Sequence, residues 1–160
     1  MVVAILLAAT VAGCSSDKGP DLTDSSPAFE GLPHDVVVQS LADPSLQEAL
    51  KATDPSDRVQ MAQLNISSTI FCRDALHAYQ VWTTTGTTPV APTVVEPQTP
   101  AAGFDAFMNE WVDAVRQIIS SGDPDNLRTW LLAGGAGCHD TVADPGANPN
   151  RTVADVLQGS

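Results

Sequence analysis

The sequence predicts an all-α fold: a small single-core bundle of four or five helices over residues 35–160, with a long Thr/Pro-rich connector. Apolar residues recur at helical spacing in two long segments, one ending at Trp82 and one at Ile119. Asp-Pro pairs at 43–44, 54–55 and 123–124 are typical helix starts, because the carboxylate accepts from free amides and proline fits the first helical position. No segment has the strict alternation of a half-buried strand.

The first ordered element is expected near Asp35, where apolar residues alternate with polar ones in a helix-like way. Asp43-Pro44 interrupts this element and predicts a short second helix over 44–52. After Asp54-Pro55, one stripe of apolar or small residues continues for six turns at alternating spacings of three and four. Its members are Met61, Leu64, Ser68, Phe71, Ala75, Ala78 and Trp82.

The connector 83–102 contains prolines at 89, 92, 97 and 100, a density that no helix tolerates. We expect an extended surface connector. The alternative is a segment that carries sugars, because exported Thr/Pro-rich segments are often O-glycosylated.

The clearest amphipathic helix follows the connector and ends near Gly122. Its apolar stripe comprises Phe104, Phe107, Met108, Trp111, Val112, Val115, Ile118 and Ile119. Such a stripe must be buried, so we expect this helix to pack on the helix ending at Trp82 as an antiparallel pair.

Three elements complete the domain. Asp123-Pro124 begins a short helix that continues to Leu132 and runs into the tight turn Gly134-Gly135-Ala136-Gly137. Residues 140–150 are expected to form a loop, and Thr152 to cap a helical turn over 153–157.

The N-terminal residues have the features of an export signal. Val2 to Val11 form an apolar run of ten residues, too short to cross a bilayer, which indicates an export signal. The tetrad Val11-Ala12-Gly13-Cys14 resembles the lipobox of bacterial lipoproteins. The low lysine content and abundant alanine resemble lipoproteins of high-GC Gram-positive bacteria.

The resemblance implies that residues 1–13 are removed as a signal peptide and that the Cys14 thiol is lipidated with fatty acyl chains such as palmitate. The protein would then be held at the outer face of the cell membrane. The alternative is ordinary secretion, with Cys14 left as a free thiol. Residues 14–34 are polar and broken by Gly and Pro, and we expect a flexible tether there.

With Cys14 acylated, Cys72 and Cys138 remain as an even pair in an oxidising exterior, and a disulfide is expected between them. Two free buried thiols, or a metal site shared with His139, are the alternatives. No Cys-x-x-Cys spacing supports a metal, so neither a metal nor a cofactor is expected.

Composition narrows the function. Seven basic against nineteen acidic residues, a formal charge of −12, argue against nucleic acid and anionic lipid headgroups as partners. The motifs of the common hydrolases, metalloproteases and nucleotide-binding proteins are absent, so we expect a non-enzyme. A helix-surface ion pair with Arg73 or Asp74 explains His77, and a solvated loop explains His139-Asp140.

Two functions remain. The first is a membrane-anchored, non-enzymatic lipoprotein whose helical domain docks an envelope protein or cell-wall partner. The alternative is a carrier of a small apolar ligand or lipid, held in a cavity between the two long helices. The residues expected to line that cavity are Met61, Phe71, Phe107, Met108 and Trp111.

Overall fold

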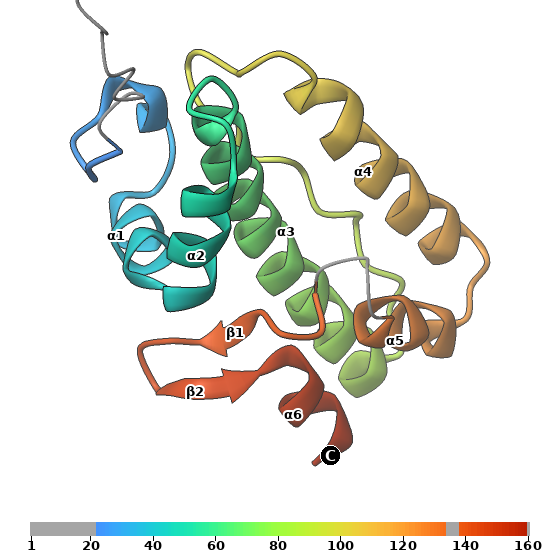
Figure 1. The fold of residues 1–160 in the computed structure, drawn as a ribbon. Coiled ribbons are helices and arrows are strands. Elements are labelled where there is room, and N and C mark those ends of the chain that lie inside the picture. The colour runs from blue at the N-terminus through green and yellow to red at the C-terminus, as the bar shows by residue number, and fades with distance from the viewer. Residues whose placement is uncertain (1–21, 134–137, 160) are drawn as a thin grey trace, which may run out of the picture.

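The computed structural model describes residues 22–133 and 138–159, and this part of the chain is mostly helical (Figure 1). The helices are α1 (His34–Ala42), α2 (Pro44–Ala52), α3 (Arg58–Thr85), α4 (Phe104–Ser120), α5 (Pro124–Leu132) and α6 (Val153–Gln158), preceded by a 3-10 turn, η1 (Pro27–Phe29). Two short strands, β1 (Val142–Asp144) and β2 (Asn148–Thr152), form an antiparallel hairpin. The described residues thus contain six α-helices and a small sheet, where the sequence predicted four or five helices and no strand.

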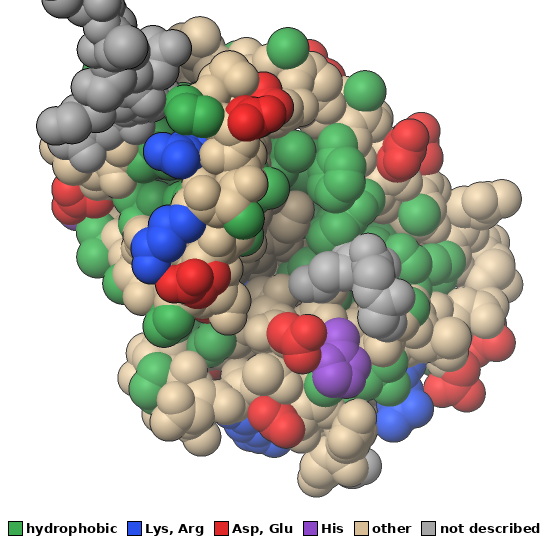
Figure 2. Space-filling model, viewed as in Figure 1, with side chains coloured by type: hydrophobic (Ala, Val, Ile, Leu, Met, Phe, Trp, Pro, Cys, Tyr) green, Lys and Arg blue, Asp and Glu red, His purple; other side chains and the backbone are tan. Residues whose placement is uncertain are grey.

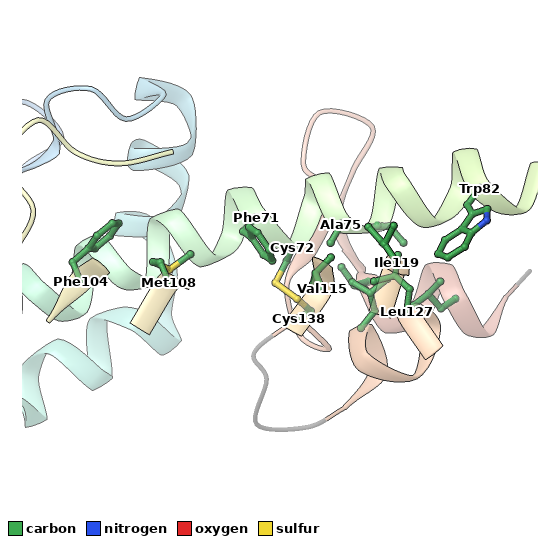
Figure 3. Packing of buried hydrophobic residues seen from close by; sticks show 14 residues of the cluster. Phe71, Cys72, Ala75, Trp82, Phe104, Met108, Val115, Ile119, Leu127 and Cys138 are labelled. Atoms are coloured by element: carbon green, nitrogen blue, oxygen red, sulfur yellow. A yellow bond between two sulfur atoms is a disulfide. The ribbon is translucent and has the colours of Figure 1, made fainter. Parts of the chain in front are cut away.

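The long helix α3 is the centre of the domain, since η1, β1 and the other five helices all contact it. Its first half, through Ile70, packs in one apolar cluster with η1, α1 and α2. Its second half, from Phe71 to Trp82, packs in another cluster with α4, α5 and α6 (Figure 3). A single helix therefore supplies residues to two core clusters along its length.

The helices α3 and α4 run parallel, and the predicted antiparallel pairing is wrong. Ser68 of α3 contacts Met108 of α4, and the Phe71 ring lies 6.1 Å from the Trp111 ring, so residue numbers rise together along both helices (Figure 3). The physical reason is the length of the connector. Between Thr85 and Phe104 an extended chain can reach about 60 Å, which exceeds the roughly 42 Å length of α3.

The connector is extended from Gly86 onward, whereas residues 83–85 of the predicted connector are the last residues of α3. It returns along α3 by hydrogen bonds to buried polar side chains. The Ser67 hydroxyl donates to the Val95 carbonyl at 2.9 Å, and both Ser67 and Gln63 are 0% exposed. The Gln63 amide donates to the Thr99 carbonyl at 3.0 Å and accepts from the Ala101 N–H at 2.8 Å. These bonds bring the start of α4 beside the start of α3.

Two of the three Asp-Pro pairs begin helices as predicted. The Asp43 carboxylate accepts from the Ser45 N–H at 2.7 Å, and the Asp123 carboxylate accepts from the Asp125 N–H at 2.9 Å. The prediction for Asp54-Pro55 is wrong. Those residues form a turn, and α3 begins three residues later at Arg58.

Part of the predicted tether belongs to the domain. Phe29 is 3% exposed and Leu32 is 8% exposed, and both pack in the cluster with α1 and α2. Gln63 also donates to the Ala28 carbonyl at 2.6 Å, and His34 is the first residue of α1. The segment was predicted to be flexible because it is mostly polar, but two of its apolar residues, Phe29 and Leu32, are buried against α1, α2 and α3. Cys14 and the rest of the predicted signal and tether up to residue 21 lie outside the described residues, as do Gly134–Gly137.

The hairpin replaces the loop predicted for residues 140–150. Val142 pairs with Thr152 and Asp144 with Asn148, with an irregularity between them. The strands lack the alternation expected from a half-buried sheet because β2 is exposed along most of its length and contains Pro149. The hairpin is held instead by α3, because Arg73 Nε donates to the Val142 carbonyl at 2.8 Å.

A capping box begins α6, which confirms the predicted cap at Thr152. The Thr152 hydroxyl accepts from the Asp155 N–H, and the Asp155 carboxylate accepts from the Thr152 N–H. These bonds hold the pKa of the exposed Asp155 carboxyl below its usual range.

None of the helices in the described ranges is both long and apolar enough to cross a membrane.

Candidate functional site

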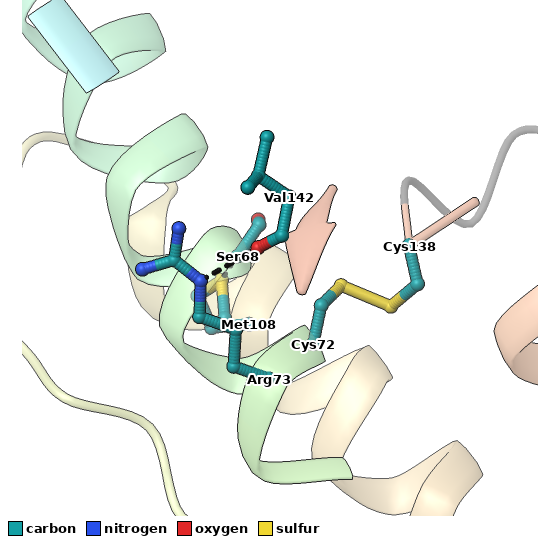
Figure 4. The surroundings of a disulfide bond; sticks show 6 residues. All are labelled: Ser68, Cys72, Arg73, Met108, Cys138 and Val142. Carbon is teal, nitrogen blue, oxygen red and sulfur yellow. Dashed lines mark hydrogen bonds between the residues drawn. A yellow bond between two sulfur atoms is a disulfide. The ribbon is translucent and has the colours of Figure 1, made fainter. Parts of the chain in front are cut away.

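Cys72 and Cys138 form the predicted disulfide, with their Cα atoms 5.3 Å apart (Figure 4). Both residues are 0% exposed. Cys72 lies in the middle of α3, and Cys138 precedes the hairpin, so the bond fastens the C-terminal part of the domain to its central helix. Two free thiols and a metal shared with His139 are excluded as descriptions of this pair.

The five residues predicted to line a ligand cavity do not gather in one place. Phe71 and Met108 are 0% and 1% exposed and are packing residues of the cluster around α4 and α5. Trp111 is half-buried, and Phe107 is 39% exposed. Met61 packs in the other cluster, beside α1 and α2. Four of the five therefore meet as neighbours between α3 and α4, and Met61 does not.

The aromatic members of this group form a series of ring contacts that also includes Trp130 of α5, which was not among the five predicted residues. The Phe107 and Trp111 rings lie 5.5 Å apart, and the Trp111 and Trp130 rings meet edge to face at 5.7 Å. Phe71 meets both tryptophans at just over 6 Å. Hydrophobic side chains gather along α4 on the face drawn in Figure 2, where acidic side chains are spread widely. The four aromatic rings in contact, those of Phe71, Phe107, Trp111 and Trp130, stabilise the junction of α3, α4 and α5.

A different feature has the shape of a binding site: three pockets follow one side of α3, and we call them together the α3 groove. The first, of about 200 Å³, lies between α3, α1, α2 and β1. The second, of about 340 Å³, lies between α3, the hairpin and α6. The third, of about 510 Å³, lies between α3 and connector residues 89–93. Arg73 lines the first two pockets and His77 the last two, so the pockets adjoin.

Arg73 is the half-buried cation at the centre of the α3 groove. Besides its bond to Val142, its guanidinium donates to the Gln39 side-chain oxygen at 2.8 Å (Figure 4 shows the Val142 bond). Burial lowers the pKa of Arg73, and the carboxylates of Asp35 and Asp144 partly offset this effect. Neither carboxylate lies within ion-pair distance, because the four ion pairs of the described chain do not include Arg73.

His77 is exposed one turn beyond Arg73 and faces two different environments. Toward the hairpin its pocket contains Arg151, Asp144 and Asn148. Toward the connector its pocket is lined mostly by apolar side chains and includes Asp74. Burial raises the pKa of the Asp74 carboxyl, and the neighbouring His77 opposes this shift. The predicted ion pair of His77 with Asp74 is thus a longer-range interaction rather than a contact within 4 Å.

His139 and Asp140 form a pair on the surface, with Nδ1 and Oδ1 2.8 Å apart. The side chains are 43% and 94% exposed. An imidazole and a carboxylate with this much solvent around them match the solvated loop that the sequence predicts.

The α3 groove is not among the sites predicted from the sequence, although part of its signal is visible there. Asn65, Thr69, Arg73, His77 and Gln80 recur at spacings of three and four, so they share the polar side of the long helix. A polar stripe alone does not distinguish a groove from a solvated face. The hairpin that forms the opposite wall was predicted as a loop.

Among residues 22–133 and 138–159, no three His, Cys, Asp or Glu side chains are placed to hold a metal ion together. No known family model matches the sequence, and neither a curated protein nor a solved structure matches it.

Proposed function

We propose that this protein is a lipid-anchored extracytoplasmic lipoprotein, without enzymatic activity, whose folded domain docks an envelope protein or cell-wall partner. Removal of residues 1–13 would leave Cys14 as the lipidated N-terminus on the outer face of the cell membrane. We further propose that the helices around α3 form a bundle and that this bundle presents the docking surface.

One observation carries the proposal: the three cysteines divide between two tasks. Cys72 and Cys138 are paired and completely buried within the domain. A disulfide in a small domain is typical of an oxidising, extracytoplasmic compartment. The chain's remaining cysteine is Cys14, which ends the lipobox-like tetrad. Pairing thus supports export, and the tetrad supports acylation of the cysteine that pairing leaves over.

The anchor is tested by metabolic labelling with an alkyne analogue of palmitate in cells that produce the protein. We expect label in the wild type and none in Cys14→Ala. We also expect the wild type in the membrane fraction and Cys14→Ala in the soluble exterior fraction, because two or three acyl chains anchor a protein durably.

The matched control is the double variant Cys72→Ser/Cys138→Ser, which keeps Cys14 and should keep the label. Absence of label from the wild type, or Cys14→Ala protein that stays with membranes, would overturn the anchor. Docking is tested by chemical cross-linking on intact cells. A defined larger species is expected from the wild type and not from Cys14→Ala, because release removes the domain from the partner's layer.

The carrier role remains the alternative function, and one observation favours it at a place other than the one the sequence suggested. The pocket between α3 and the connector is walled mainly by Ala78, Val81 and the segment 89–92. Its volume of about 510 Å³ lies within the usual range for small-ligand sites.

A further inference from the structure

The middle pocket of the α3 groove concentrates positive charge in an acidic protein. The chain has only seven Lys and Arg residues against nineteen acidic ones. Two of the seven, Arg73 and Arg151, line this single pocket of about 340 Å³ together with His77. The carboxylate in the same pocket is Asp144, and its Oδ1 already accepts from the Ala147 N–H at 3.0 Å. Two guanidinium groups against one carboxylate give the pocket lining a net positive charge, which Asp35 offsets in part by its effect on Arg73, and this net charge favours an anion in an otherwise acidic protein.

Arg73 has guanidinium N–H groups that make no hydrogen bond among the described residues. A guanidinium carries five N–H groups, and those of Arg73 make hydrogen bonds to Val142 and Gln39. The remaining N–H groups have no hydrogen-bond acceptor among the described residues, and no carboxylate lies within 4 Å. A half-buried guanidinium without an ion pair is costly for a fold to keep. An oxyanion bound in the pocket would supply the missing acceptors.

Arg151 lies on the opposite wall of the middle pocket. It lies on the exposed strand β2, and its side chain makes no hydrogen bond within the described chain. Its charge helps to lower the pKa of Asp155, which is an electrostatic influence and not a contact. Arg73 and Arg151 thus approach the same space from α3 and from the hairpin.

The neighbouring pocket supplies an apolar surface next to these charges. It shares His77 with the middle pocket, and Val81 and Val90 lie on its walls. Val81 is 37% exposed and Val90 is 90% exposed, which makes them two of the four large apolar residues that the described chain leaves exposed. An apolar chain lying there would remove both from water, a gain of about 25 cal/mol per Å² of buried surface.

We propose that the α3 groove binds an anionic amphiphile, with its oxyanion head between Arg73, Arg151 and His77 and its apolar chain against Val81 and Val90. The head is a carboxylate or a phosphate monoester, since both present the oxygens that guanidinium groups bind. This inference deepens the carrier alternative and rests on it, but it does not depend on the lipid anchor.

The charges decide which way the ligand lies. The pocket on the other side of Arg73 contains Asp43 and Asp140, which repel an anion. The middle pocket contains one carboxylate, Asp144, and a second arginine, Arg151. An oxyanion head therefore enters the middle pocket, and its chain extends past His77 toward the connector.

Isothermal titration calorimetry tests this with the full chain carrying Cys14→Ala, which removes the acylation site and leaves the folded domain unchanged. The probes are dodecanoate, dodecyl phosphate, inorganic phosphate and, as a neutral amphiphile, dodecyl maltoside, each below its micelle concentration. We expect one site for dodecanoate or dodecyl phosphate, and the stronger of the two identifies the head. Inorganic phosphate should bind at least about tenfold more weakly, because each buried methylene adds affinity.

Variants locate the site. Arg151→Gln removes a charge without removing a hydrogen bond of the fold, and it should weaken dodecanoate binding about threefold to tenfold. Val90→Asn should weaken it as well while leaving inorganic phosphate unaffected. The matched control is Arg116→Gln on α4, which removes an equal charge from an exposed ion pair with Asp113 and should change affinity less than about twofold. Arg73→Gln is informative only if its amide NMR spectrum stays folded, and Arg151→Gln does not carry that risk.

The binding measurements can either support or overturn the proposed site. Binding that falls in Arg151→Gln and not in Arg116→Gln, with amide NMR shifts in residues 73–81 and 143–151, supports the site. Equal binding of dodecyl maltoside, equal loss in both arginine variants, or no binding of either anionic amphiphile would overturn it. Membrane attachment is measured in a separate experiment, so failure here leaves the anchor proposal unaffected, and the reverse also holds.

Discussion

Gln63 shows how a single buried polar residue organises distant parts of the chain. It is 0% exposed in α3, and its amide bonds to backbone groups of Ala28, Thr99 and Ala101. Ala28 lies in the short 3-10 turn η1, and Thr99 and Ala101 lie in the connector, which has no regular structure. Among the described residues no buried side-chain polar atom lacks a partner. The amide thus allows irregular backbone to lie against a helix core.

Replacement of Gln63 with leucine should therefore cost far more than its hydrophobicity suggests. Gln63→Leu leaves three backbone groups without partners, and we expect the free energy of unfolding to fall by about 3 kcal/mol. Urea denaturation followed by circular dichroism measures this loss. The control Gln117→Leu changes an exposed glutamine of α4 and should stay within about 0.5 kcal/mol of the wild type. Equal effects of the two substitutions would contradict the role given to Gln63.

The three Asp-Pro pairs show that one local signal can have two structural outcomes. The Asp43 and Asp123 carboxylates cap α2 and α5. Asp54 instead accepts the Asp57 N–H with its backbone carbonyl and lies in a turn before α3. Thr53, just before it, donates its hydroxyl to the Ala49 carbonyl and receives the Arg58 side chain on its own carbonyl. These contacts hold the chain in a bend between α2 and α3, and the helix starts after the bend.

The three aspartates allow a matched test of capping. Asp43→Ala and Asp123→Ala should each lower the free energy of unfolding by about 1 kcal/mol, because each leaves helix amides without an acceptor. Asp54→Ala should cost less than about 0.5 kcal/mol, since its side chain makes no capping bond. Thermal unfolding of the three variants under identical conditions ranks them. A loss for Asp54→Ala as large as the other two would show that its carboxylate caps α3 in solution.

The connector decides the topology of the domain. It brings the chain from the end of α3 back to the start, where Gln60 donates to the Ala102 carbonyl, and α4 then runs parallel to α3 (Figure 1). A connector that only turned the chain would give the antiparallel pair. The extended Thr/Pro-rich segment is thus a required spacer.

Shortening the connector tests this arrangement. Deletion of residues 87–94 leaves a segment that reaches about 33 Å, which is less than the roughly 38 Å from Thr85 back to the level of Gln60. We expect that variant to lose its cooperative unfolding transition. Deletion of 87–89 leaves a reach of about 50 Å and should keep the transition. If the longer deletion were tolerated as well as the shorter one, an antiparallel pair would describe the protein better.

The disulfide stabilises the whole domain, because it closes a loop of 66 residues between the central helix and the hairpin. On the chain-entropy model, Cys138→Ser should lower the free energy of unfolding by about 4 kcal/mol. A reducing agent should produce a similar loss in the wild type and none in Cys138→Ser. Cys14→Ser is the matched control and should leave the unfolding curve unchanged. A wild type that is indifferent to reduction would refute this contribution.

Local signals along the chain predict the amphipathic stripes of α3 and α4, the caps at Asp43 and Asp123, and the cysteines available to pair. These features depend on neighbours within a turn or two, or on simple elimination, and so they can be read along the chain. Tertiary contacts, by contrast, set the direction of α4, the burial of Phe29 and Leu32, the hairpin, and the placement of Arg73, Arg151 and His77 around one pocket. Each of these depends on contacts between residues far apart in sequence, where the reach of an extended connector and buried hydrogen bonds select one arrangement among several.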